Sequence, residues 1–260
     1  MTPVKTRILA ACILAATVAV PAFASQAEPE DKGSPSQILT RMKNGNMRFV
    51  GGRSLHPHLN LERLKQAGSE NQANHAYATI ITCSDSRVPV EHIFDAGIMD
   101  LFVIRVAGNV VDTDEAGSIE YGLAHVHTPL LVVLGHTQCG AVTAVTQSVH
   151  GMNHELERNI PPLVDNIEPA VKRAIALNPQ VLGEDIIPAA IEENVWQSIE
   201  DLFMASPATR EMVKGGSVKV VGAVYDVGSG KVNWLPEAKV VEIMDRVEKS
   251  PARAIEAMAQ

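Results

Sequence analysis

Two short segments of this chain hold residues that are well suited to bind a metal ion. His136 and Cys139 are separated by two residues, so one turn can present both side chains to a single ion, and Cys83 begins a second segment, CSDSR. Zinc binds cysteine sulfur and histidine nitrogen, and a catalytic zinc keeps one coordination position open. Cys83, His136 and Cys139 would supply two thiolates and one imidazole, which leaves the fourth position to water or to a carboxylate such as Asp85.

The same cysteines also permit two interpretations without a metal. Cys83 and Cys139 could form a disulfide, because disulfides persist in exported proteins. They could equally be two buried thiols that pack as small apolar side chains in a core. The residues alone leave the zinc site, the disulfide and the buried thiols open as alternatives.

Asp85 and Arg87 add a second chemical pair to the first segment. A carboxylate and a guanidinium can pair through two parallel hydrogen bonds. Such a pair would hold Asp85 away from a metal bound by Cys83 and would orient a water molecule on that metal. The plainer alternative is a salt bridge within a loop.

Three apolar runs of strand length lie around these segments. They lack the alternation of polar and apolar residues that marks a half-exposed strand, which is typical of strands buried on both faces of a parallel sheet. Segments long enough for crossover connections separate them, so the pattern predicts βαβ units and an α/β fold. Cys83 follows the first run and His136 follows the third, which places both at the carboxyl edge of the sheet, where open α/β sheets carry their sites. The runs are residues 78–82 (ATIIT), 101–105 (LFVIR) and 130–134 (LLVVL).

The other elements complete a mostly parallel four-stranded sheet flanked by helices. Residues 218–226 are the fourth strand candidate, and a glycine-containing turn joins them to residues 232–235 in a hairpin that adds a C-terminal edge strand. Residues 34–37 (SPSQ) have the cap, the proline and the glutamine of a helix start with a capping box. Residues 237–260 are expected to form a final helix with a frayed end.

The composition excludes several classes of protein. Of the 260 residues, 46% are hydrophobic and 20% are charged, which excludes a wholly disordered chain. The formal net charge of −8 argues against a nucleic-acid partner, whose affinity would depend on neutralising phosphates with lysine and arginine. The three cysteines, Cys12, Cys83 and Cys139, are too few for a disulfide scaffold.

The first 24 residues have the organisation of a secretory signal peptide. Lys5 and Arg7 precede an apolar run, and a small-residue A-x-A pattern follows at 22–24. Residues 25–33 are polar and are expected to form a flexible leader. We therefore expect residues 34–260 to form one domain that is exported, as a periplasmic or secreted protein, with no membrane partner after signal cleavage.

Together the two chemical segments resemble the β-class carbonic anhydrases. CSDSR at 83–87 followed by HTQCG at 136–140 is a specific combination, and the resemblance extends over residues 34–235. It implies an enzyme that reversibly hydrates carbon dioxide to bicarbonate and a proton, through attack of a zinc-bound hydroxide, with one Zn²⁺ per chain.

The resemblance also implies a role for each residue of the two segments. Cys83, His136 and Cys139 would bind the zinc, and Asp85 and Arg87 would form a catalytic pair beside it. Asp85 would become the fourth zinc ligand in a closed, inactive state.

A narrow substrate cleft, partly at a subunit interface, is a further implication. The chain would form a homodimer that can pair into tetramers. One position departs from the family pattern, because many members place a glutamine nine residues before the first cysteine, where this chain has Asn74. The implied cleft residues are Asn74, Phe102, Ala107, Tyr121 and Gly140.

Three alternative functions remain open on the sequence. The same scaffold could hydrolyse carbonyl sulfide or carbon disulfide, which are isoelectronic with carbon dioxide. An exported zinc-binding or bicarbonate-sensing module could keep the fold without catalysis, although the presence of both Asp85 and Arg87 argues against it. A disulfide-stapled binding protein is the third alternative.

Overall fold

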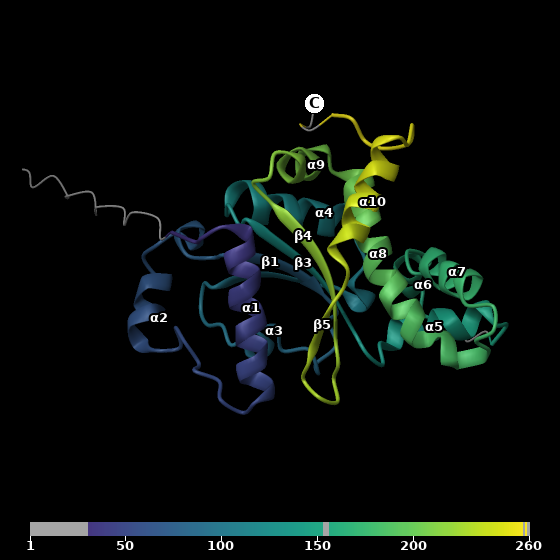
Figure 1. Cartoon of the computed structure of the whole chain (residues 1–260), viewed down its shortest axis with the longest axis horizontal. Helices are drawn as coiled ribbons and strands as arrows, with labels where there is room; N and C mark the ends of the chain where they lie inside the picture. The colour runs from purple at the N-terminus through teal and green to yellow at the C-terminus, as the bar shows by residue number, and fades with distance from the viewer. Residues whose placement is uncertain (1–30, 153–155, 257, 259–260) are drawn as a thin grey trace, which may run out of the picture.

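Five strands form one sheet in the order β2-β1-β3-β4-β5 (Figure 1). The first four pair in parallel, and β5 pairs with β4 in the antiparallel direction. This is the predicted α/β fold, with a mostly parallel sheet and an added C-terminal edge strand. The strands are β1 (Ala78–Thr82), β2 (Leu101–Arg105), β3 (Leu130–His136), β4 (Lys219–Tyr225) and β5 (Val232–Trp234).

The computed structural model describes residues 31–152, 156–256 and 258. The signal peptide expected at 1–24 and most of the leader expected at 25–33 lie outside these residues. Within the described part of the chain, no helix is both long enough and apolar enough to cross a membrane.

Helices and short helical turns connect and flank the strands. The helices are α1 (Pro35–Val50), α2 (Leu61–Ala67), α3 (Val90–Ile93), α4 (Thr113–Glu120), α5 (Gly140–Val149), α6 (Ile160–Asp165), α7 (Glu168–Leu177), α8 (Ile187–Ala205), α9 (Pro207–Lys214) and α10 (Glu237–Glu248). The short turns are 3₁₀ segments at Gln72–Asn74, Ala107–Asn109 and Gly183–Ile186, and a π-helical turn at Tyr121–His125 that continues α4.

The start of α1 has the predicted capping box. Ser34 Oγ accepts a hydrogen bond from the Gln37 backbone N–H, and the Gln37 side chain accepts one from the Ser34 backbone N–H. Pro35 occupies the first turn, where a missing N–H costs the helix nothing.

The two faces of the sheet carry separate cores. Ile80 and Val132 point to one face, where α1 and α3 cover them. Ile81 and Val133 point to the other face, where α4, α8 and α10 cover them. Figure 1 shows α1 and α10 on opposite sides of the strands. β1 and β3 are buried on both faces, which explains why they show no polar alternation, whereas the edge strand β2 is half-buried.

Two predicted boundaries were wrong. The third strand continues past Leu134, because Gly135 and His136 pair with Val224 and Tyr225 of β4, and His136 is therefore the last residue of the strand. The final helix ends at Glu248 instead of reaching residue 260. Pro251 opposes continuation, because proline lacks an N–H and disfavours helical geometry in the preceding residue.

Candidate metal centre

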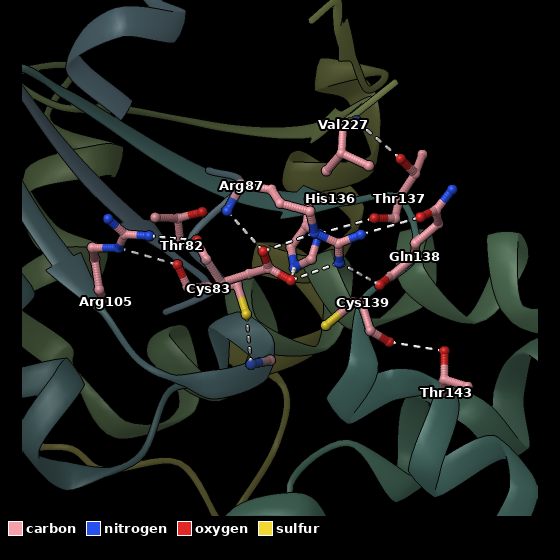
Figure 2. Close-up of polar contacts among 12 residues, drawn as sticks. Thr82, Cys83, Arg87, Arg105, His136, Thr137, Gln138, Cys139, Thr143 and Val227 are labelled. Carbon is pink, nitrogen blue, oxygen red and sulfur yellow. Dashed lines mark hydrogen bonds and ion pairs between the residues drawn. The ribbon is translucent and has the colours of Figure 1, made fainter. Parts of the chain in front are cut away.

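Cys83, His136 and Cys139 come together at the carboxyl edge of the sheet. The two sulfur atoms and one ring nitrogen of His136 all lie within 4.8 Å of one another. The three side chains are buried, and Figure 2 shows them pointing toward one another from separate segments. Cys83 follows β1, His136 ends β3, and Cys139 directly precedes α5, so the centre is assembled by the two central strands and one helix start.

The hydrogen bonds of His136 fix which of its nitrogens faces the centre. Nδ1 lies 2.9 Å from the carbonyl oxygen of Thr137, which can only accept, so Nδ1 carries the hydrogen. Nε2 is buried and has no hydrogen-bond partner among the described residues. A buried acceptor without a partner destabilises a fold. A metal ion between Nε2 and the two sulfurs would satisfy it, so the donor set fits zinc.

The hydrogen bond between the two cysteines shifts their pKa values in opposite directions. The Cys139 thiol donates to Cys83, and this hydrogen bond lowers the pKa of Cys83 to about 4, with smaller contributions from His136 and the Gly108 N–H. The same bond, together with burial, raises the pKa of Cys139. Both cysteines are free, so the structure gives no support to the disulfide alternative.

Asp85 and Arg87 form the two-pronged ion pair expected from their types. Arg87 Nε donates to Asp85 Oδ1 at 3.0 Å and Nη2 donates to Oδ2 at 2.7 Å, while the Arg87 backbone N–H also donates to Oδ1. These hydrogen bonds hold the pKa of Asp85 well below its usual range. Asp85 Oδ2 remains 3.9 Å from His136 Nε2, so the ionised carboxylate borders the centre without occupying it.

Gln138 connects the two segments through Arg87. Its side-chain Oε1 and its backbone oxygen each accept a hydrogen bond from the guanidinium, at 3.1 Å. Gln138 adopts a left-handed backbone conformation (φ 57°) between His136 and Cys139. Arg87 is thus held by the segment that carries the other two ligand candidates.

Other positioning residues were not predicted from the sequence. Arg105, at the end of β2, donates to the backbone oxygens of Cys83 (3.2 Å) and Asp85 (2.7 Å), and Figure 2 shows its guanidinium beside Cys83. Gly108 donates its backbone N–H to Cys83 Sγ at 3.3 Å. A charged residue at the end of an apolar strand was the signal available for Arg105, whereas nothing in the sequence marks a backbone donor.

The expected cleft residues are divided between two parts of the molecule. Ala107 precedes Gly108, and Gly140 is the first residue of α5 with open space where a Cβ would lie, so both are close to the ligand candidates. Phe102 and Tyr121 contact each other on the β2 side of the sheet, with ring centroids 6.0 Å apart, and Tyr121 is 52% exposed.

Asn74 is not near this chain's own ligand candidates. It lies in a 3₁₀ turn before β1, whereas Cys83 follows that strand. The five residues of β1 separate the two positions by roughly 17 Å at about 3.3 Å per residue.

Comparisons with known proteins agree on one family. Residues 78–232 match the family described as carbonic anhydrase. A carbonic anhydrase of Mycolicibacterium smegmatis is 36% identical over 200 residues, which cover 76% of this chain and 92% of that protein. Residues 78–232, which match the family, include the three ligand candidates and both residues of the ion pair.

Solved structures show the same fold. The β-carbonic anhydrase CafA of Aspergillus fumigatus matches with a TM-score of 0.59 at 24% identity, covering 82% of this chain and 97% of that one. A β-carbonic anhydrase of Sordaria macrospora, described as tetrameric, matches with a TM-score of 0.58 at 22% identity, covering 76% of this chain and 97% of that one. At these identities the likeness establishes the architecture.

Proposed function

This chain belongs to the β-class carbonic anhydrase family, and from that premise we propose that it hydrates carbon dioxide reversibly at a zinc centre made by Cys83, His136 and Cys139. The observation that carries this proposal is the buried Nε2 of His136, which has no hydrogen-bond partner in the described part of the chain and lies beside two free thiols. Bound Zn²⁺ would act there as a Lewis acid that makes a nucleophile available from water near neutral pH.

The role we assign to Asp85 follows from its protonation state. The hydrogen bonds from Arg87 keep its pKa low, so Asp85 is a weak base that stays ionised in neutral solution. It therefore accepts a hydrogen bond from the attacking group and fixes its orientation, instead of removing a proton. The proton produced by hydration leaves to solvent or buffer.

Arg87 and Gln138 hold Asp85 in this orienting position. Arg87 is a permanent cation, and it contacts Asp85 on one side and Gln138 on the other. Release of Asp85 from Arg87 would free the carboxylate to become a fourth zinc ligand and would close the centre. We propose the Arg87-bound arrangement as the active one.

Carbon dioxide is small and apolar and offers little binding energy, so the cleft must act mainly by position. We propose that the cleft includes Ala107 and Gly140 of one chain. Asn74, Phe102 and Tyr121 would face it from a second chain in a homodimer, and the tetrameric description of the Sordaria macrospora relative is consistent with a larger assembly. We also propose export through the N-terminal signal.

The test is stopped-flow hydration of carbon dioxide by purified protein of measured zinc content, at neutral and at alkaline pH. Rapid hydration by the wild-type protein, lost in Cys83→Ser, is the expected result. A protein that holds one zinc per chain and shows no hydration at either pH would overturn the proposal. Product assays with carbonyl sulfide and carbon disulfide would then identify the reaction.

A further inference from the structure

A strained turn brings a backbone donor to the Cys83 sulfur. Gly108 and Asn109 are consecutive residues with positive φ, 77° and 47°, within the 3₁₀ turn Ala107–Asn109. A non-glycine residue in this conformation is strained and persists only where its surroundings enforce it. This backbone conformation places the Gly108 N–H so that it donates a hydrogen bond to Cys83 Sγ at 3.3 Å.

Helix α8 supplies the side chains that hold this turn. Asn194 Nδ2 donates to the Gly108 carbonyl oxygen at 2.7 Å. Ser198 Oγ lies one helical turn further along, 2.8 Å from the Asn109 carbonyl oxygen, and it accepts a hydrogen bond from Asn109 Nδ2 at 3.4 Å. Asn194, Ser198 and Asn109 are each at most 2% exposed, so no solvent competes for these bonds.

The turn also fits closely against its other neighbours. A Cβ on Gly108 would lie 2.6 Å from Ile167 Cδ1 and 3.2 Å from Ala141 Cβ, and the φ of 77° disfavours any side chain at this position. Asn194 Oδ1 is buried without a hydrogen-bond partner among the described residues. An amide that leaves its oxygen unpaired is a poor choice for packing alone, so its value lies in the donor aimed at Gly108.

We propose that Asn194, assisted by Ser198, is a positioning residue for the metal centre. It fixes the 107–109 turn so that the Gly108 N–H stays on Cys83 Sγ. A hydrogen bond to a thiolate withdraws electron density from the sulfur and reduces its donation to a bound metal. The bound ion is then a stronger Lewis acid than it would be with two thiolates that accept no hydrogen bond. This inference rests on the metal centre of the proposed function and concerns a residue outside both sequence segments.

The experiment uses the full protein loaded with Co²⁺, whose sulfur-to-metal charge-transfer band reports the electron density on the thiolates. Asn194→Leu removes the donor and keeps the number and branching of the side-chain heavy atoms. Its matched control is Gln197→Met, which removes a buried amide of the same helix that bonds to Asp201 and not to the turn. We expect the band of Asn194→Leu to move to longer wavelength and its Gly108 amide to exchange roughly tenfold faster, with both unchanged in Gln197→Met.

Two results would overturn the proposed role of Asn194. A folded Asn194→Leu protein with the wild-type band and wild-type Gly108 exchange would overturn the proposal. If Asn194→Leu does not fold, Ser198→Ala takes its place, and a band that stays at the wild-type wavelength there would overturn it as well.

The controls separate this proposal from the proposed function. A wild-type protein without any sulfur-to-Co²⁺ band would overturn both. A wild-type protein with the band but without carbon dioxide hydration would overturn only the proposed function and would leave the role of Asn194 to be decided by the variants.

Discussion

A histidine is buried among charged groups at each end of the parallel strands, which we call the amino edge and the carboxyl edge of the sheet. The hydrogen bonds of the two histidines differ. At the amino edge, before β1 and β2, His75 lies between Arg63 and Glu70, with Nδ1 2.9 Å from Arg63 Nη1 and Nε2 2.7 Å from Glu70 Oε2. At the carboxyl edge, His136 Nε2 has no hydrogen-bond partner among the described residues. The residue type is the same, and only the second histidine has a nitrogen left for a ligand.

The amino-edge network shows how a histidine is used for structure. An arginine can only donate, so His75 Nδ1 accepts from Arg63 and its Nε2–H donates to Glu70. Asp100 is 1% exposed and its Oδ1 contacts both Arg63 Nη2 (3.3 Å) and His58 Nδ1 (2.7 Å). Each charged group has an opposite charge or a hydrogen-bond partner, so this edge stabilises the fold and leaves the chemistry to the other edge.

Cys83→Ser is expected to give the largest difference in zinc content and activity between a variant at the carboxyl edge and one at the amino edge. Losing a thiolate removes the zinc and the several kcal/mol that a Lewis acid contributes, so hydration activity should fall by roughly 10³-fold or more. Zinc content and stopped-flow hydration measure this directly. The amino-edge variant His75→Ala should keep one zinc per chain when folded, and equal zinc loss in both variants would remove the distinction between the edges.

Arg63→Met should show the opposite pattern. Removing one partner of a buried charge network leaves the others uncompensated, so we expect the free energy of unfolding in urea to fall by about 3 kcal/mol. Zinc content and the activity of the folded protein should stay at wild-type values. Arg158→Met, at an exposed arginine, is the control and should leave stability unchanged. A variant that loses zinc before it loses stability would contradict the structural role of this edge.

Asp85→Asn should separate orientation from metal binding at the carboxyl edge. The amide keeps the size of the carboxylate but loses its charge, so we expect kcat/KM to fall by roughly 10²-fold. Zinc content should remain at one per chain, because Asp85 does not occupy the centre in the Arg87-bound arrangement. Zinc loss equal to that of Cys83→Ser would instead place Asp85 among the constitutive ligands.

The smallest expected effect is a pH dependence of stability. The pKa of Asp85 is lowered by hydrogen bonds from Arg87, so the pair stabilises the fold above the unfolded pKa of a carboxyl and loses this contribution as the pH falls through the folded pKa. The difference in unfolding free energy between wild type and Arg87→Met should therefore be present at neutral pH and shrink below about pH 4. Urea unfolding at a series of pH values measures it, and a difference that grows on acidification would contradict this origin.

The sequence was sufficient where a local pattern determines the outcome. The apolar runs predicted β1 and β2 at their observed bounds. The expected burial on both faces is found in β1, whereas β2 lies at the edge of the sheet and is only half-buried, with Arg105 exposed. The types and spacing of Cys83, His136 and Cys139 predicted the cluster that the structure brings together. The capping box at Ser34 was predicted for the same reason, since all its atoms lie within one turn.

The sequence was insufficient where contacts join distant segments. Arg105 and Asn194 act on backbone groups of the centre, and neither carries a signal that spacing can reveal. The end of β3 at His136 depends on the length of β4, which lies far along the chain. The roles expected for Asn74, Phe102 and Tyr121 involve a second chain and stay predictions.

The distance in sequence between the parts of the centre has a consequence for the order of folding. Cys83 and His136 meet only after β1 and β3 have paired, and the 107–109 turn is held only after α8 has docked on the sheet. Contacts between segments so far apart form slowly, because the chain loses loop-closure entropy before the contacts contribute any stabilisation. Metal uptake should accordingly lag behind the recovery of secondary structure during refolding, so the ion reports the completion of the fold and does not nucleate it.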